Sequence, residues 1–176
     1  MSRIDLKVIL QDTVSNGYGD LVTRPTGKAV RGGVVEALAG LDGEQTAIID
    51  FSAVRCLDIS CADEIVGKLL LQYGAARLFL LYGVTAAHCD AIEQVLERHR
   101  LAVVARDRDG KIQVLGPLAE PARRAFGILS DRGPAAPEEV ATELAVGPEV
   151  ARRALEELRT LRLVLQASDR YTAVTA

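Results

Sequence analysis

The densest group of reactive side chains in the sequence lies in the stretch DISCADE, residues 58 to 64. It holds the hydroxyl of Ser60 and the carboxylates of Asp58, Asp63 and Glu64. The spacing from Ser60 to Asp63 fits Ser-x-x-Asp, a pattern that predicts a capping box at the start of a helix. The serine oxygen would then accept a hydrogen bond from a free backbone amide, which stabilises the helix by about 1 kcal/mol.

The same position is also suited to phosphorylation. A helix N-terminus carries partial positive charge and therefore tolerates a phosphoryl group. Phosphorylation would add about two negative charges beside three carboxylates and would change the surface that a partner protein meets. The sequence leaves both interpretations open, a cap alone or a cap that is also a switch. The candidates for phospho-acceptor or partner contact are Ser60, Asp58, Asp63 and Glu64.

Cysteine and histidine could bind a metal, but their spacing argues against it. The three cysteines, Cys56, Cys61 and Cys89, are an odd number, which does not favour a disulfide framework. Cys56 and Cys61 lack zinc-knuckle spacing, although His88 and Cys89 could add ligands. We expect small buried thiols and neither a metal nor another cofactor.

The usual signatures of catalysis are missing. Gly27-Lys28 fails as a phosphate loop, because Val22 stands where glycine is needed and Ala29 where Ser or Thr is needed. Asp50 ends an apolar strand, and we expect it to cap the following loop through backbone amides. We expect His99 on the apolar side of its helix. With no nucleophile–base pair at meaningful spacing, the sequence indicates a protein that is not an enzyme.

Composition narrows the class of protein further. The chain has 176 residues, 49% of them hydrophobic, and a formal net charge of −3, enough for one medium domain or two small ones. Aromatic residues make up 4% and tryptophan is absent, which argues against a stacking platform for single-stranded nucleic acid. No apolar run reaches membrane-spanning length, and the first residues do not have the pattern of a signal peptide. We expect a cytoplasmic protein without membrane contact.

Alternating strands and helices are expected to position the DISCADE stretch. The hydrophobic periodicity predicts strands at 4–10, 47–51 and 77–84, helices at about 24–41, 60–73 and 85–100, and a hairpin over 102–116 that turns at Asp109-Gly110. Gly32 and Gly33 weaken the first helix unless another element packs closely there. The order predicts an α/β fold with a mixed sheet.

The helix that follows Ser60 has a clear amphipathic pattern. Its predicted buried face carries Ala62, Ile65, Val66, Leu69, Leu70 and Tyr73. Asp63 and Glu64 fall on the opposite side with Lys68 and Gln72, and Glu64 and Lys68 are spaced for a favourable i,i+4 ion pair. We therefore expect both carboxylates at the surface.

The pattern changes at about residue 117. A connector, GPLAEP, is followed by three helical segments over 121–133, 137–146 and 148–161. Pro137 and Pro148 suit first helical positions, and Gly133 suits a helix C-terminus. The chain closes with two short strands around Ser-Asp-Arg. Three helices and a terminal hairpin predict an α+β winged helix-turn-helix domain over 117–176, after an α/β domain over 1–116.

Three stretches carry a resemblance to a known family: TRPTGKAV, IIDFSAV and LDISCADEIVGKLL. Through them, residues 4 to 116 resemble a STAS-type domain, the fold of bacterial anti-sigma-factor antagonists, and more closely the STAS-like family often encoded beside kinase-like ATPases. Antagonists carry Asp-Ser-Ser-Gly here and are phosphorylated on the second serine. This chain has Asp58-Ile59-Ser60-Cys61, which keeps that serine and changes two neighbours. The following Asp63-Glu64 is more similar to the STAS-like family.

Residues 119 to 174 resemble winged helices of bacterial regulators. The resemblance makes 148–160 the recognition helix, whose first turns would enter the DNA major groove. The DNA-binding candidates are then Arg152, Arg153 and, in the wing, Arg170. From residue 119 on, eight arginines stand against nine acidic residues, whereas DNA-binding modules concentrate positive charge. Winged helices also serve as protein-docking modules, so fold alone does not decide.

These observations lead to one expected function and one alternative. We expect a bacterial signalling or transcription regulator that acts by protein–protein contact through the STAS-like domain, with output through the winged helix. The partner implied by the resemblance is a kinase-like ATPase or a sigma-factor regulator. The alternative is a homodimeric repressor of transcription that binds double-stranded DNA and uses the STAS-like domain for dimerisation or ligand sensing.

Overall fold

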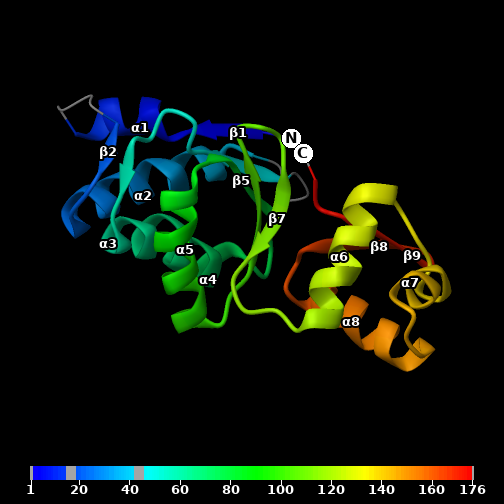
Figure 1. The fold of residues 1–176 in the computed structure, drawn as a ribbon. Coiled ribbons are helices and arrows are strands. Elements are labelled where there is room, and N and C mark those ends of the chain that lie inside the picture. Colours follow the sequence, from blue (N-terminus) through cyan, green and yellow to red (C-terminus); the bar gives the residue numbers. More distant parts are fainter. Residues whose placement is uncertain (1, 15–18, 42–45, 176) are drawn as a thin grey trace.

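The computed structural model describes residues 2–14, 19–41 and 46–175. Its centre is a five-stranded sheet in the order β1-β3-β5-β6-β7 (Figure 1). The strands are β1 (Ser2–Asp5), β3 (Ala47–Asp50), β5 (Phe79–Val84), β6 (Val103–Asp107) and β7 (Ile112–Leu115). The first four run parallel and β7 is antiparallel to β6. The predicted α/β fold with a mixed sheet is confirmed, and so is the hairpin that turns at Asp109-Gly110.

Helices from the first part of the chain pack on one face of the sheet. They are α1 (Leu6–Thr13), α2 (Arg24–Ala39), a continuous helical segment made of α3 (Ile59–Ala62), the π-helix η1 (Asp63–Gly67) and α4 (Lys68–Tyr73), and α5 (Ala86–His99). Two short strands, β2 (Asp20–Leu21) and β4 (Cys56–Leu57), pair in parallel beside them. Ile49, Leu81 and Val103 from the strands share one hydrophobic core with these helices.

The stretch 4–10, predicted as a strand, is a strand only up to Asp5. The Asp5 carboxylate accepts a hydrogen bond from the Lys7 amide at 2.8 Å and caps α1. Leu6 and Leu10, four residues apart, are then buried on one helical face. The prediction was wrong because a short apolar run fits both periodicities, and the aspartate cap ends the strand there.

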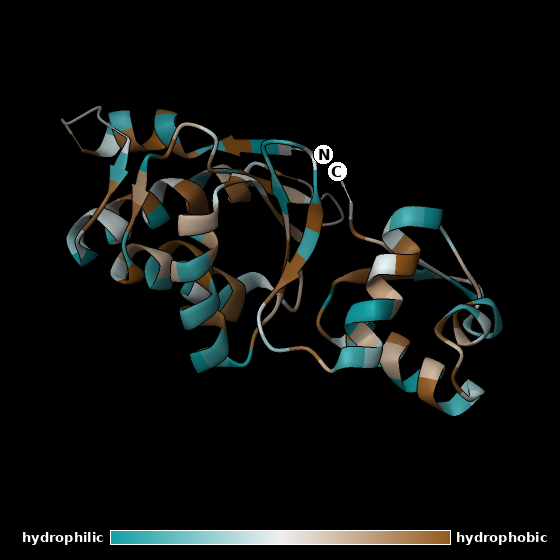
Figure 2. Cartoon of the chain, viewed as in Figure 1, coloured by the Kyte–Doolittle hydropathy of each residue, from teal (hydrophilic) through white to brown (hydrophobic). Residues whose placement is uncertain are grey.

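The other face of the sheet is covered by the C-terminal part of the chain. This part comprises α6 (Glu120–Arg132), α7 (Pro137–Leu144), α8 (Pro148–Thr160) and the antiparallel pair β8 (Val164–Ala167) and β9 (Arg170–Ala173). Figure 1 shows α5 and α6 on opposite sides of the sheet, and Figure 2 shows hydrophobic positions along the strands between them. The three predicted helices and the terminal hairpin are confirmed as elements, with Pro137 and Pro148 at first positions and Gly133 at the end of α6.

One hydrophobic cluster crosses residue 117. It joins Ile48, Leu80 and Val104 of the sheet to Phe126 of α6 and Leu155 of α8. The division of the chain into domains 1–116 and 117–176 stays a prediction. Within the described residues, none of the helices has the length and apolar content needed to cross a membrane.

Two adjacent glycines of α2 give the first testable prediction. A Cβ on Gly33 would lie 2.5 Å from Cγ2 of Ile9 in α1, whereas a Cβ on Gly32 would meet no atom within 4 Å. Gly32→Ala should therefore raise the free energy of unfolding by about 0.5–1 kcal/mol, because alanine restricts the unfolded chain. Gly33→Ala should lose that gain or destabilise, because Ile9 must move. Denaturant unfolding of both variants checks this, and an equal gain at both positions would contradict the close approach of α1 and α2.

Candidate functional site

The helix that carries Ser60 is capped by Asp58 and not by Ser60. The helical segment begins at Ile59, and Oδ1 of Asp58 accepts a hydrogen bond from the Cys61 amide at 2.7 Å. Ser60 is therefore the second residue of the first turn, and it is half-buried. The capping box predicted from Ser60 to Asp63 is wrong, because Asp58 already occupies the position that a cap requires. Ser60 keeps its place at a helix N-terminus, so its hydroxyl is not committed to capping.

Asp58 also joins two segments that are far apart in sequence. Its Oδ2 accepts a hydrogen bond from the Thr23 amide at 2.7 Å, and the Cys61 thiol donates to the Thr23 carbonyl at 3.1 Å. Burial raises the pKa of the Asp58 carboxyl, but the hydrogen bonds from the Cys61 and Thr23 amides outweigh burial and lower it. The carboxylate therefore stays ionised and holds the start of α2 against the start of α3.

Burial and the neighbouring Asp58 carboxylate raise the pKa of the Cys61 thiol to about 12. This thiol therefore remains protonated and unreactive at neutral pH. Burial also raises the pKa of Cys89. Within the part of the chain that the structure describes, no three His, Cys, Asp or Glu side chains come together as a metal site would require.

Glu64, expected at the surface, is completely buried. Its carboxylate accepts hydrogen bonds from Arg24 at 2.8 Å and Arg31 at 3.2 Å, and it forms the predicted ion pair with Lys68. Burial by itself raises the pKa of this carboxyl, but the hydrogen bonds from Lys68 and Arg24 outweigh it, so the pKa lies below its usual value. Three cations therefore compensate one buried anion.

Asp63 is buried beside it, again against expectation. Its Oδ2 accepts a hydrogen bond from Arg24 at 2.9 Å, and its Oδ1 lies 2.9 Å from Nε2 of His99 on α5. Burial raises the pKa of Asp63, and the hydrogen bonds from His99 and Arg24 outweigh it. Arg24 thus bridges both carboxylates, and neither Asp63 nor Glu64 lies on the outer surface as predicted.

Two glycines explain why these acids are buried. A Cβ on Gly27 of α2 would lie 3.0 Å from Cα of Cys61 and 3.1 Å from Cβ of Glu64. A Cβ on Gly67 would lie 2.6 Å from Cγ1 of Val95 in α5. The π-helix is therefore pressed between α2 and α5, and all its residues, Asp63 to Gly67, are buried. A helix with neighbours on two sides has no free polar face.

Apolar side chains at and near the start of the helical segment reach solvent. Val22 is 43% exposed and Ile59 is 40% exposed, and Ser60 is half-buried while Cys56 is exposed. Val22 lies between Leu21, whose carbonyl accepts from the Asp58 amide at 3.0 Å, and Thr23, whose amide donates to the Asp58 carboxylate. Val22 and Ile59 therefore flank Asp58. We refer to Val22, Cys56, Ile59 and Ser60 as the contact patch.

The arginines predicted to bind DNA lie at the surface of the C-terminal part. Arg152 of α8 forms ion pairs with Glu138 at 3.1 Å and Glu149 at 3.4 Å. Arg170 donates to the Pro134 carbonyl at 2.6 Å and pairs with Glu139 at 3.0 Å.

Arg153 is exposed, and its side chain makes no ion pair or hydrogen bond with any described residue. The structure brings Arg152 and Arg153 to one surface hollow with Glu138, Glu149 and Asp169. Glu156 lines the same hollow, so these two arginines share it with four carboxylates.

Asp50 occupies the position predicted for it. Its Oδ1 accepts a hydrogen bond from the Ser52 amide at 2.8 Å, as a loop cap does, and its other oxygen pairs with Arg3 at 2.6 Å. The site residues that the sequence reasoning missed are Arg24, Arg31 and His99, the partners of the buried acids. Their only signal was the two adjacent carboxylates ahead of the apolar run IVGKLLL, which require cations if they are buried.

Glu64→Gln is expected to lower the free energy of unfolding by about 2 to 4 kcal/mol at neutral pH. Removing one member of a buried pair leaves its partners uncompensated, although Arg24 and Lys68 reach solvent, which reduces the cost. The matched control is Glu149→Gln, because Glu149 is 86% exposed and should change stability little. Equal stability of the two variants in denaturant unfolding would contradict the compensated network.

The lowered pKa of Glu64 also predicts that the effect of Glu64→Gln on the free energy of unfolding depends on pH. Because the folded pKa of Glu64 is lowered, its stabilisation is fully present above the unfolded value of about 4.3. It is lost as the pH falls through the folded pKa. The stability difference between wild type and Glu64→Gln should therefore shrink steadily in acid. Unfolding measured from neutral pH into the acid range checks this, and a constant difference would show that charge is not its origin.

No protein-family model matches the chain, and no curated protein matches it in sequence. The features from which a function can be inferred are the contact patch, the buried acids Asp63 and Glu64 and the surface of the C-terminal part.

Proposed function

We propose that this chain is a bacterial signalling regulator that works by protein contact, with a STAS-like domain as its receiving part and a winged helix as its output. The contact patch would bind the partner. The observation that carries the proposal is the double role of Asp58. Its two carboxylate oxygens accept hydrogen bonds from the Thr23 amide and the Cys61 amide, each at 2.7 Å. These two bonds fix the backbone next to the exposed side chains of Val22 and Ile59. A surface that is already ordered loses less conformational entropy when a partner binds.

The order of elements supports the STAS-like assignment. A strand, the Thr-Arg-Pro-Thr-Gly stretch at the start of α2, a central strand and the Asp58–Glu64 stretch follow each other as in the family it resembles. Arg24 and Gly27 of that stretch contact Asp63 and Glu64 in the structure. The residues that carry the resemblance therefore carry a structural role as well.

Ser60 supplies the means of regulation in this proposal. It lies in the first turn of the helical segment, beside Ile59 and next to Asp58. A phosphoryl group there would place about two negative charges in the middle of an apolar contact surface. The fold would tolerate the change because the carboxylates beneath are already compensated by Arg24, Arg31 and Lys68. The partner interface would not, because burying an unpaired charge is costly.

Charges on the C-terminal part favour protein contact over DNA contact as its output. The carboxylates that engage Arg152 and Arg170 would have to be displaced before phosphates could bind, and Glu138 and Glu149 would remain close to the DNA backbone. Like charges at an interface cost affinity. A second candidate function, a dimeric DNA-binding repressor, is favoured by one observation, the exposed and unpaired Arg153 near the start of α8.

Ser60→Asp should abolish partner binding without unfolding the protein. Wild-type and variant chains are used as baits in native extract, and the captured proteins are identified by mass spectrometry. We expect wild type to retain a kinase-like ATPase or a sigma-factor regulator and Ser60→Asp to lose it. Ser60→Ala should retain the partner, because it leaves the surface uncharged.

Two matched variants separate the patch from the modification. Ser130→Asp adds the same charge to α6, far from the patch in sequence, and should retain the partner. Ile59→Asp should lose the partner even where Ser60 is unmodified, because it places a charge in the apolar surface. The same proteins on the wild-type and Ser60→Asp baits would contradict the proposal.

DNA binding gives an independent measurement. At physiological salt we expect no saturable binding of mixed-sequence duplex DNA by fluorescence anisotropy, because the arginine surface is neutralised by carboxylates. A steep loss of affinity with rising salt, abolished by Arg153→Gln and kept by Arg98→Gln at an exposed arginine of α5, would instead support the repressor.

A further inference from the structure

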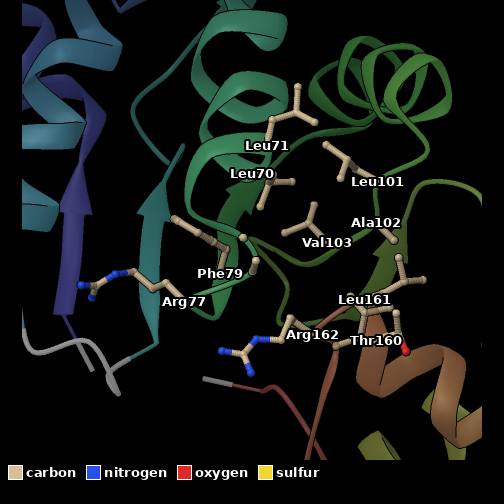
Figure 3. A pocket seen from close by; sticks show the side chains of 13 residues that line it. Leu70, Leu71, Arg77, Phe79, Leu101, Ala102, Val103, Thr160, Leu161 and Arg162 are labelled. Atoms are coloured by element: carbon tan, nitrogen blue, oxygen red, sulfur yellow. The ribbon is translucent and has the colours of Figure 1, made fainter.

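A cavity of about 250 Å³ lies where the helical layer of the first part meets the end of α8 (Figure 3). Its walls come from four places in the chain: the end of α4 and the turn after it, the start of β5, the start of β6 with the two residues before it, and residues 160 to 163. Pockets that bind small molecules often lie where two parts of a chain meet. This one is distinct from the contact patch.

The walls are mainly hydrocarbon. Leu70, Leu71 and Leu101 lie together at one end, with Phe79 and Val103 next to them (Figure 3). Leu71 is 55% exposed, so part of the apolar wall faces solvent. Covering such apolar surface with a ligand is favourable, because it removes the surface from water.

Every ionisable side chain that lines the cavity is an arginine. Arg77 donates to the carbonyls of Leu38 and Leu41 at 3.5 Å and 3.2 Å, and its guanidinium points away from the leucines (Figure 3). Arg162 lies at the edge opposite Leu71 and Leu101 and is exposed, and its side chain makes no hydrogen bond or ion pair with a described residue. Among the residues that the structure describes, no carboxylate lines the cavity, and Thr160 is one of its lining residues.

We propose that this cavity binds a small amphipathic carboxylate, with its hydrocarbon against Leu70, Leu71 and Leu101 and its carboxylate on Arg162. A guanidinium binds a carboxylate through two parallel hydrogen bonds. A cavity of about 250 Å³ is large enough for a medium-chain or aryl carboxylic acid. The bound ligand would contact α4 and the end of α8 together.

The ligand series tests the chemistry without any variant. Octanoate, octanol and octylamine are titrated into the full chain, and binding is followed by calorimetry and by methyl NMR shifts of the leucines. Octanoate should bind saturably, octanol at least about tenfold more weakly because it lacks the charge, and octylamine not at all. No saturable binding of octanoate, or equal binding of octanol, overturns the proposal.

Variants then locate the site. Arg162→Gln should weaken octanoate binding about tenfold or more and leave octanol unchanged. Arg153→Gln, an exposed arginine of α8 outside the cavity, is the matched control and should change neither. Ala75→Leu, at an exposed position on the cavity wall, should block both ligands without loss of stability. Octanoate binding that survives Arg162→Gln and Ala75→Leu would place the ligand elsewhere and overturn the assignment.

Discussion

The rest of the structure depends on a sheet that is apolar on both faces. Neighbouring residues in three strands, Ile48 and Ile49, Leu80 and Leu81, and Val103 and Val104, enter opposite hydrophobic clusters. Such a sheet must be covered twice. The helices between the strands cover only one face of the sheet, and α6 packs against the other face. The position of the C-terminal part, and with it the cavity beside α8, follows from this requirement.

The second organising feature is the compensation of two adjacent buried acids. Arg24 at the start of α2 and His99 at the end of α5 both contact Asp63, so the network joins three helices across one point. A buried ion pair adds little to the net free energy of unfolding. An arrangement that left either acid without its cations would be strongly destabilised, because its charge would be buried without compensation. The contact patch lies at the start of the same helical segment, where Asp58 joins Thr23 to Cys61.

Much of the fold could be predicted from the sequence, since periodicity and turn residues give the strands, helices and terminal hairpin almost throughout. The site could be predicted only in part. Apolar spacing placed Ile65 and Leu69 inward, but it carries no information on how many neighbours a helix has, and Gly27 and Gly67 admit helices from two sides. Similarly, Ser60 looked like the cap because its Ser-x-x-Asp pattern was complete, whereas Asp58, an equally suitable cap by residue type, accepts the bond from the Cys61 amide.

The π-helix has a consequence for how this segment can change. A π turn contains one residue more than an α turn, so Asp63–Gly67 behaves as a one-residue insertion in an otherwise regular helix. The residues of α3 that precede it are rotated about the helix axis by about 100° relative to their positions in an uninterrupted α-helix. A natural deletion of one residue here would restore α geometry, yet it would turn Ile59 and Ser60 to another side of the molecule. The extra residue thus sets the direction in which the contact patch faces.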